Sequence, residues 1–253
     1  MAAADVILNG SGAGARFGND LAGCDVDGDG LDDAVVSAYK ASPYGLSEAG
    51  QVHVFYGSMG AGEYDANSSS IKLYGNASGD WAGNQVACAD LNHDGYDDLL
   101  VASTHAGAGG ANKSGRIDLI FGGPNLPSEM NLSQGNHSIH GNESNGYLGN
   151  SLATGDYNGD GIKDAIITSP QADPYGFPQA GKAYLLAVTE NNTETTYTRI
   201  NCEGSPIDNN GWHITQTTNC TNTQPYTNGP LNITNNNQLK LTQTTIQINT
   251  TIQ

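Results

Sequence analysis

Acidic side chains crowd into three short stretches of this chain. The first reads DVDGDGLDD from residue 25, the second DLNHDGYDD from residue 90, and the third DYNGDGIKD from residue 156. Carboxylates this close together repel one another, so each stretch needs either full solvation or a compensating cation. Ca²⁺ takes six to eight oxygen ligands, and short acidic side chains alternating around a tight turn can supply them.

The three stretches share the frame D-x-[DN]-x-D-G-x-x-D, with oxygen-bearing side chains at positions 1, 3, 5 and 9. The glycine at position 6 permits the positive φ that turns these side chains inward, and position 7 adds a backbone carbonyl. We therefore predict three Ca²⁺ sites, with these ligands: Asp25, Asp27, Asp29, Leu31 and Asp33; Asp90, Asn92, Asp94, Tyr96 and Asp98; Asp156, Asn158, Asp160, Ile162 and Asp164.

These stretches differ from an EF-hand, although the first half of each resembles one. An EF-hand needs a bidentate glutamate at position 12 and a helix after it. Position 12 is Val36, Val101 or Ile167, each in the middle of a predicted strand. Each stretch is therefore expected to be a hairpin between two strands. The alternative of a solvated acidic turn is disfavoured because the ligand positions recur in all three copies.

The acidic stretches belong to a longer repeat. They begin at residues 25, 90 and 156, which gives intervals of 65 and 66 residues. An aromatic marker precedes each stretch (Phe17, Trp81 and Tyr147), and a segment such as AGQVHVFYG follows it. The N-terminal DVILNGSG matches the segment before each marker, so the chain is expected to start partway through a unit. Periods of this size are typical of stacked supersecondary units, with propeller blades the leading all-β candidate.

Turn residues and short β-branched runs dominate the composition, which favours an all-β fold. We expect β-propeller blades of four antiparallel strands, with three clear units and a degenerate fourth. The strands of the first unit are expected at about 20–24, 33–38, 51–56 and 70–74. The runs AVVSA, LLVAS and AIITS, which follow the acidic stretches, predict strands that are covered on both faces near the propeller axis.

The segments around the first acidic stretch resemble those of a known family of repeats. The segment FGNDLAGCDVDGDGLDDAVVSAYKA, followed by AGQVHVFYG, resembles the FG-GAP repeat of integrin α-subunit propellers. The resemblance covers about residues 5–188 and implies blades that hold Ca²⁺ in the hairpin between their first and second strands. The phenylalanine–glycine pair is Phe17-Gly18, and the other copies depart from it with Trp81-Ala82-Gly83 and Tyr147-Leu148-Gly149.

The resemblance leaves the number of blades open. Such propellers usually have seven blades, whereas this chain has three clear units. The chain therefore closes a smaller ring, is part of a longer protein, or is completed by neighbouring chains.

The composition changes after about residue 188, so residues 1–188 are expected to form the repeats and residues 189–253 a degenerate fourth repeat. Trp212 stands 65 residues after Tyr147, but no aspartate follows it where the acidic stretch would lie. Near the end, apolar residues alternate with polar ones, which favours a strand over a disordered tail. Such a strand can add to the open sheet edge of another copy. The alternating residues are Leu239, Leu241, Ile246, Ile248 and Ile252.

Charge and motifs exclude several classes of function. The net charge of −17, with nine Lys and Arg, argues against nucleic acid or an anionic membrane as a partner. No apolar run is long enough to span a membrane, and MAAADVILNG lacks the regions of a signal peptide. The chain has no HExxH, G-x-S-x-G or P-loop motif, so no enzyme activity is expected.

Cysteines and sequons bear on the cellular location. Cys202 and Cys220 flank a polar segment and can form a disulfide in an oxidising compartment. Cys24 and Cys88 are as readily explained as small buried residues in strands. Five N-x-[ST] sequons lie in predicted surface turns and are candidate glycosylation sites, which favours an extracellular protein. These are Asn67, Asn76, Asn131, Asn136 and Asn142.

Two classes of function follow. The first is a secreted structural or adhesive module that forms an oligomer or filament through edge-strand pairing. The second is a module that recognises a glycan or a protein ligand through its loops. The repeated acidic loops fit both classes, and we favour assembly because the units are incomplete and the C-terminal segment is strand-like.

Overall fold

The computed structural model describes residues 5–107 and 112–187 with their side chains, and beyond residue 187 it describes the backbone of six short strands. The described part is all-β, as predicted, and its helices are single 3₁₀ turns. No helix among the described residues has the length or apolar character needed to cross a membrane.

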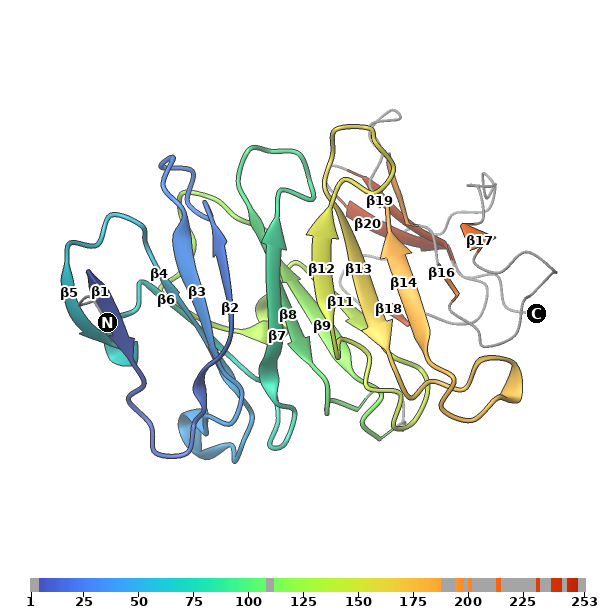
Figure 1. Cartoon of the computed structure of the whole chain (residues 1–253), viewed down its shortest axis with the longest axis horizontal. Helices are drawn as coiled ribbons and strands as arrows, with labels where there is room; N and C mark the ends of the chain where they lie inside the picture. The colour runs from blue at the N-terminus through green and yellow to red at the C-terminus, as the bar shows by residue number, and fades with distance from the viewer. Residues whose placement is uncertain are drawn as a thin grey trace.

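Three antiparallel sheets follow one another along the chain (Figure 1), and we call them blades 1, 2 and 3. Blade 1 consists of β2 (Phe17–Cys24), β3 (Asp33–Ala38), β4 (Gln51–Phe55) and β6 (Ile71–Tyr74). Blade 2 consists of β7 (Ala82–Ala89), β8 (Asp98–Ser103), β9 (Arg116–Ile120) and β11 (His137–His140). Blade 3 consists of β12 (Leu152–Gly155), β13 (Asp164–Ser169) and β14 (Lys182–Leu186).

Short elements connect or flank these strands. Four 3₁₀ turns lie in the loops: η1 (Pro43–Gly45), η2 (Ala66–Ser68), η3 (Leu132–Gln134) and η4 (Pro174–Gly176). The strands after residue 187 are β15 (Glu194–Tyr197), β16 (Ile200–Asn201), β17 (His213–Ile214), β18 (Leu231–Asn232), β19 (Gln238–Thr242) and β20 (Thr245–Asn249). Trp212, Cys202 and Cys220 lie outside the described residues, so the predicted fourth repeat and its disulfide stay predictions.

The N-terminal strand β1 (Val6–Asn9) holds the place of an outermost blade strand. It pairs in parallel with β5 (Gly62–Asp65), just as β6 of blade 1 pairs in parallel with β10 (Glu129–Asn131). Among the described residues β1 has no other strand partner. The segment therefore corresponds to the strand before the aromatic marker in the other units, as the sequence predicted.

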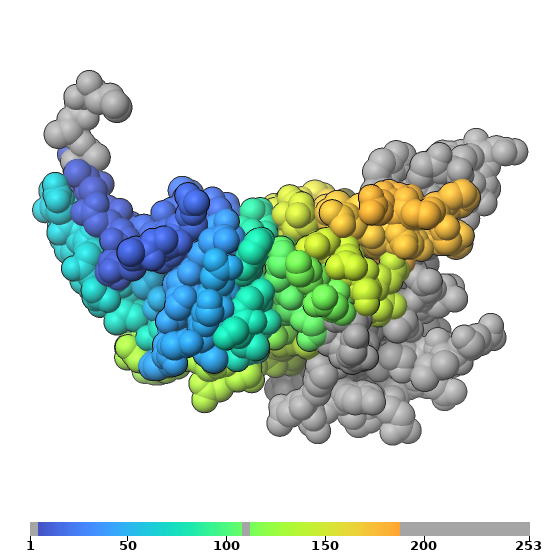
Figure 2. Space-filling view, turned by 90° about the horizontal axis from the view of Figure 1, so that it is seen from below, coloured from blue at the N-terminus to red at the C-terminus, as the bar shows by residue number. Residues whose placement is uncertain are grey.

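The three blades stand in chain order from one end of the described structure to the other (Figure 2). Their innermost strands β2, β7 and β12 lie side by side (Figure 1). The strand after each acidic loop is the second of its blade, because β3, β8 and β13 each lie one place further out. These strands are largely buried, and each takes the second position in its blade, as the sequence predicted.

The core lies between the blades, and β8 shows how the sequence builds it. All six of its residues are buried. Because successive side chains of a strand point to opposite faces, Leu99 and Val101 pack in the cluster with blade 1, while Leu100 and Ala102 pack in the cluster with blade 3. A continuous apolar run is therefore what a strand between two neighbouring blades requires.

The structure also corrects the alignment of the aromatic markers. Phe17 pairs with the last residue of β3, and Ala82 pairs with the last residue of β8, so Phe17 corresponds to Ala82 and not to Trp81. Trp81 corresponds instead to Arg16, and both have positive φ angles, 59° and 62°. The position of the family's phenylalanine therefore holds an alanine in blade 2.

His53 of β4 is a buried histidine whose pKa depends on its surroundings. Its ring is 3% exposed and packs against Phe17 and Phe55, and its Nδ1 lies 3.0 Å from Ser69 Oγ. Desolvation lowers the pKa of His53 to about 4, with a further contribution from the charge of Lys72. Between about pH 6.5 and 4, His53 is therefore protonated in the unfolded chain but neutral in the folded chain. The free energy of unfolding consequently decreases as pH falls through this range.

We expect His53→Asn to remove this dependence. Urea unfolding at several pH values between about 7 and 5 should show that the wild type loses up to about 1.4 kcal/mol per pH unit more than the variant. Because both proteins carry the same carboxylates, their difference isolates the imidazole. Parallel pH profiles for the two proteins would show that His53 titrates normally.

Candidate metal centres

The first acidic hairpin joins β2 to β3 and gathers three carboxylates. Asp25, Asp27 and Asp29 each offer an oxygen, and these atoms lie within 4.8 Å of one another. Asp25 accepts hydrogen bonds from the backbone N–H groups of Gly28, Asp29 and Gly30, at 2.8, 3.1 and 2.9 Å. The side chains therefore point into the turn, in the arrangement expected of cation ligands.

The second and third hairpins repeat this network. Asp90 and Asp156, at position 1, each accept from the backbone N–H at positions 5 and 6. The position-3 asparagines accept at Oδ1 from the N–H at position 5, and donate from Nδ2 to its carboxylate at 2.9 Å in both loops. The glycines at position 6 have φ angles of 87°, 90° and 91°, a conformation that side-chain-bearing residues rarely adopt. They are Gly30, Gly95 and Gly161.

The aspartates at position 9 lie below their loops and are buried. Asp33 is 1% exposed, and its two oxygens accept from the N–H groups of Val26 and Gly57 at 2.9 and 2.8 Å. Asp98 accepts in the same way from Leu91 and Gly122, both at 3.0 Å. These carboxylates tie the acidic loop to the end of the third strand of the blade. Their role as ligands, like that of the carbonyls of Leu31, Tyr96 and Ile162, stays a prediction.

The pKa values of these carboxylates shift upwards at the buried base of the loops and downwards at the exposed surface of the third loop. Desolvation raises the pKa of Asp98 to about 7, against the two backbone hydrogen bonds, and the charges of Asp94 and Asp90 raise it further. Desolvation is also the main cause that raises the pKa of Asp33. At the exposed surface of the third loop, backbone hydrogen bonds, led by that of Gly161, lower the pKa of Asp156.

The donor set fits a calcium ion. All side-chain donors of each loop are oxygen atoms, which hard cations prefer, and there is no nitrogen or sulfur ligand among them. Three carboxylates within 4.8 Å repel one another unless a cation offsets their charge. Residues at positions 1, 3 and 5 would hold the ion, and the ion would neutralise each loop and fix the hairpin.

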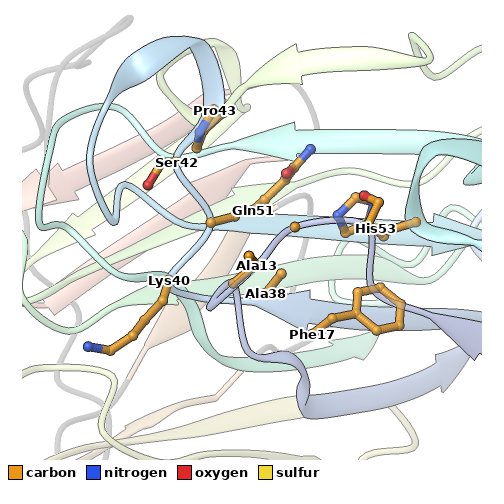
Figure 3. A pocket seen from close by; sticks show the side chains of 13 residues that line it. Ala13, Phe17, Ala38, Lys40, Ser42, Pro43, Gln51 and His53 are labelled. Atoms are coloured by element: carbon orange, nitrogen blue, oxygen red, sulfur yellow. The ribbon is translucent and has the colours of Figure 1, made fainter.

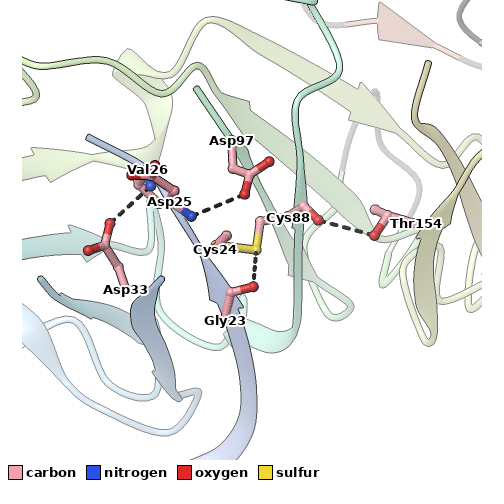
Figure 4. Close-up of a disulfide and its surroundings, with 8 residues drawn as sticks. All are labelled: Gly23, Cys24, Asp25, Val26, Asp33, Cys88, Asp97 and Thr154. Carbon is pink, nitrogen blue, oxygen red and sulfur yellow. Dashed lines mark hydrogen bonds between the residues drawn. A yellow bond between two sulfur atoms is a disulfide. The ribbon is translucent and has the colours of Figure 1, made fainter. Parts of the chain in front are cut away.

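One pair of cysteines is linked in a way that the sequence did not indicate. Cys24 and Cys88 form a disulfide between β2 and β7, with Cα atoms 6.3 Å apart (Figure 4). From the sequence, these two cysteines were as readily explained as small buried residues in strands. Their separation of 64 residues, close to the repeat length, was the available signal, because it puts them at adjacent heights in neighbouring blades.

The candidate glycosylation sites fall into two groups. Asn67, Asn136 and Asn142 are exposed. Asn76 and Asn131 are half-buried, and both accept from the N–H of Ser133, at 2.8 and 2.9 Å, so they hold the turn η3. All five stay predictions.

A pocket of about 290 Å³ opens on the flank of blade 1, with Phe17, Gln51 and His53 among its lining residues (Figure 3). In blade 2, Arg116 takes the place of Gln51, and its Nε lies 2.9 Å from Asp118 while its Nη2 lies 3.5 Å from Asp80. Leu132 takes the place of Ala66. Gln51 and Ala66 are therefore smaller than their counterparts in blade 2, whereas Phe17 is larger than its counterpart Ala82.

Comparison with known proteins places the repeats in a family. The model of the FG-GAP repeat matches residues 17–55, 82–120 and 148–186. The matches begin at Phe17, Ala82 and Leu148, which is the register that the structure gives. Each match runs from the first strand of a blade through its acidic hairpin to the third strand.

Relatives carry the same repeats within much longer chains. Phosphatidylinositol-glycan-specific phospholipase D is 31% identical over 172 residues in Mus musculus, covering 66% of this chain and 20% of that protein. The Homo sapiens form is 31% identical over 151 residues, 58% of this chain and 17% of that protein. Integrin alpha-PS5 of Drosophila melanogaster is 28% identical over 173 residues, 66% of this chain and 16% of that protein. The chain thus matches at most a fifth of the length of these three relatives.

Proposed function

Because this chain is an FG-GAP repeat protein, with three propeller blades of integrin type, we propose that it is an extracellular calcium-binding module with a structural or adhesive role. In this proposal three Ca²⁺ ions stabilise the hairpins, the chain performs no catalysis, and copies of the chain assemble into an oligomer or filament. An adhesion or recognition module is the coarser function that the FG-GAP repeats support.

One observation carries the proposal of assembly. Leu21 on β2 is 70% exposed, whereas Val86, at the same position of β7, is 7% exposed. Blade 1 covers Val86, but the described residues offer no equivalent cover for Leu21. Apolar flanks of repeat units are normally covered by another unit. A second copy that packs its own blade on this flank makes a heterologous contact, and such contacts extend into filaments when they do not close.

The β1 strand and the disulfide add support. Among the described residues β1 pairs only with β5, so its other edge can accept a strand from a second copy. The Cys24–Cys88 disulfide favours an oxidising location outside the cell. The exposed sequon asparagines agree with that location.

The test is particle size by sedimentation velocity and electron microscopy, first with Ca²⁺ and then with EGTA. We expect oligomers or filaments with Ca²⁺, dissociation on chelation, and loss of assembly in Leu21→Glu. Tyr175→Glu is the matched control, because Tyr175 is also an exposed apolar residue, at 61%, but lies on η4 of blade 3. A monomer under both conditions contradicts self-assembly.

The pocket on blade 1 favours a second candidate function, recognition of a glycan or protein ligand. It combines the aromatic ring of Phe17 with the amide of Gln51 and the hydroxyls of Ser11 and Ser42, a mixture typical of sites for neutral polar ligands. If the protein is monomeric, a screen of neutral oligosaccharides against the wild type and Gln51→Ala distinguishes this function from assembly.

A further inference from the structure

Two hydrogen bonds join the first two acidic loops, one to a side-chain carboxylate and one between backbones. The N–H of Asp25, position 1 of loop 1, donates to Asp97 Oδ2 at 3.1 Å, and the N–H of Asp97 donates back to the carbonyl of Asp25 at 2.9 Å. Asp97 is position 8 of loop 2 and lies between two of its predicted ligands. The main chain of Asp25, the first predicted ligand of loop 1, is therefore held in place by a residue of loop 2.

Two more contacts hold loop 1 against blade 2. The N–H of Gly123 donates to the carbonyl of Val26 at 2.8 Å. The ring of Tyr96 lies against Gly28 so closely that a Cβ added there would stand 2.3 Å from Tyr96 Cε1. Tyr96 is position 7 of loop 2, so an ion that orders this loop also orders the surface on which loop 1 rests.

A covalent link lies at the base of both loops. Cys24 comes directly before Asp25, and Cys88 comes two residues before Asp90, so the disulfide joins the two strands that lead into the first ligands (Figure 4). Relative movement of these strands is the movement that would separate the two sites. The disulfide restricts it.

Loop 3 makes different contacts with loop 2. Lys163 stands at the position of Asp97 and is exposed, and the structure gives it no hydrogen bond to residues 90–98, all of which are described. Ile162 stands at the position of Tyr96 and packs into the apolar cluster with Leu91 and Ala89. The strand before loop 3 has Thr154 in place of a cysteine, and Thr154 donates one hydrogen bond to the carbonyl of Cys88.

From these contacts we infer that loops 1 and 2 are a coupled pair of calcium sites, while loop 3 binds its ion independently. The inference rests on the proposed calcium binding. An ion in loop 2 fixes residues 96–98, and within this segment Asp97 holds the main chain of Asp25. Loop 1 therefore loses less conformational freedom when its own ion binds. The carboxylate of Asp97 also adds a negative charge beside loop 1. By linkage, an ion in loop 1 favours binding at loop 2 by the same factor.

The test is calorimetric Ca²⁺ titration of the full chain with loops disabled at position 5. Asp160→Ala leaves loops 1 and 2, Asp94→Ala leaves loops 1 and 3, and the double variant leaves loop 1 alone. We expect loop 1 to bind about five- to tenfold more tightly when loop 2 is intact, and to be indifferent to loop 3. Equal affinity of loop 1 in all three proteins overturns the coupling.

A second series keeps every predicted ligand, in case disabled loops fail to fold. Asp97→Ala should abolish the coupling, and Cys24→Ala with Cys88→Ala should weaken it. Asp32→Ala and Lys163→Ala change the same position in the other two loops and should leave it intact. Cooperative binding that survives Asp97→Ala contradicts the inference. Absence of any calcium binding in the wild type would instead refute the proposed function.

Discussion

We expect removal of Ca²⁺ to lower the melting temperature of this protein by about 8 to 32 °C. Extracellular calcium modules have Kd values on the order of 10⁻⁴ to 10⁻³ M. At about 10 mM Ca²⁺, each site then adds about 1.4 to 2.7 kcal/mol to the free energy of unfolding, so three sites add about 4 to 8 kcal/mol. For a domain of this size, about 1 kcal/mol shifts the melting temperature by about 2 to 4 °C.

Charge explains why the effect should be this large. The chain carries a net charge of −17, and three Ca²⁺ ions would offset six of those charges. Without the ions, the carboxylates of Asp25, Asp27 and Asp29 repel one another at distances within 4.8 Å. The hairpins also connect the first two strands of each blade, so a loosened loop frees the innermost strand that contacts the neighbouring blade.

The measurement is thermal unfolding followed by circular dichroism, with about 10 mM Ca²⁺ and then with EGTA. Mg²⁺ at the same concentration controls for ionic strength, because its smaller coordination sphere suits these loops poorly. Asp29→Asn and Asp32→Asn provide the matched pair: position 5 is a predicted ligand and position 8 is not. Equal melting temperatures with and without the chelator would refute calcium binding as the source of stability.

Local features of this fold could be read from the sequence, since they depend on residue types at fixed spacing. The frame of the acidic loops predicted which side chains turn inward, and the hydrogen bonds of Asp25, Asp90 and Asp156 show that arrangement. The apolar run at residues 34–38 likewise predicted a strand covered on both faces. Both patterns are short-range, so one stretch of sequence contains all of the information.

Features that depend on neighbouring blades could not be read in this way. The pocket is lined by Ser11, Ala38 and Ala66, which come from separate segments of the chain and meet only in the folded structure. The contact between Asp25 and Asp97 joins residues 72 apart, and no local pattern indicates it.

Gly115→Ala should be among the most damaging single substitutions in the described chain. Gly115 forms a bridge to Leu148 at the junction between blades 2 and 3, and its φ is 85°. A Cβ at this position would lie 2.2 Å from the carbonyl oxygen of Leu148 and 2.4 Å from its nitrogen. These are backbone atoms, so the clash can be relieved only by moving one blade away from the other.

Gly79→Ala is the matched control, because Gly79 has a similar φ of 81° but open space around its Cβ position. This substitution should lower the free energy of unfolding by about 1 kcal/mol, from backbone strain alone. Gly115→Ala should cost about 3 to 5 kcal/mol, because overpacking adds to that strain. Gly50→Ala, which meets the backbone of Ala82 in the same way at the junction of blades 1 and 2, should behave like Gly115→Ala.

Urea unfolding of the three variants in saturating Ca²⁺ measures these costs. If Gly115→Ala and Gly50→Ala cost no more than Gly79→Ala, the blades do not approach as closely as described. If both variants lose more stability than Gly79→Ala, Gly50→Ala should also weaken the calcium coupling of loops 1 and 2, whereas Gly115→Ala should not. Only the first junction carries the contacts between Asp25 and Asp97, so the pattern would connect the packing of the blades to the behaviour of their metal sites.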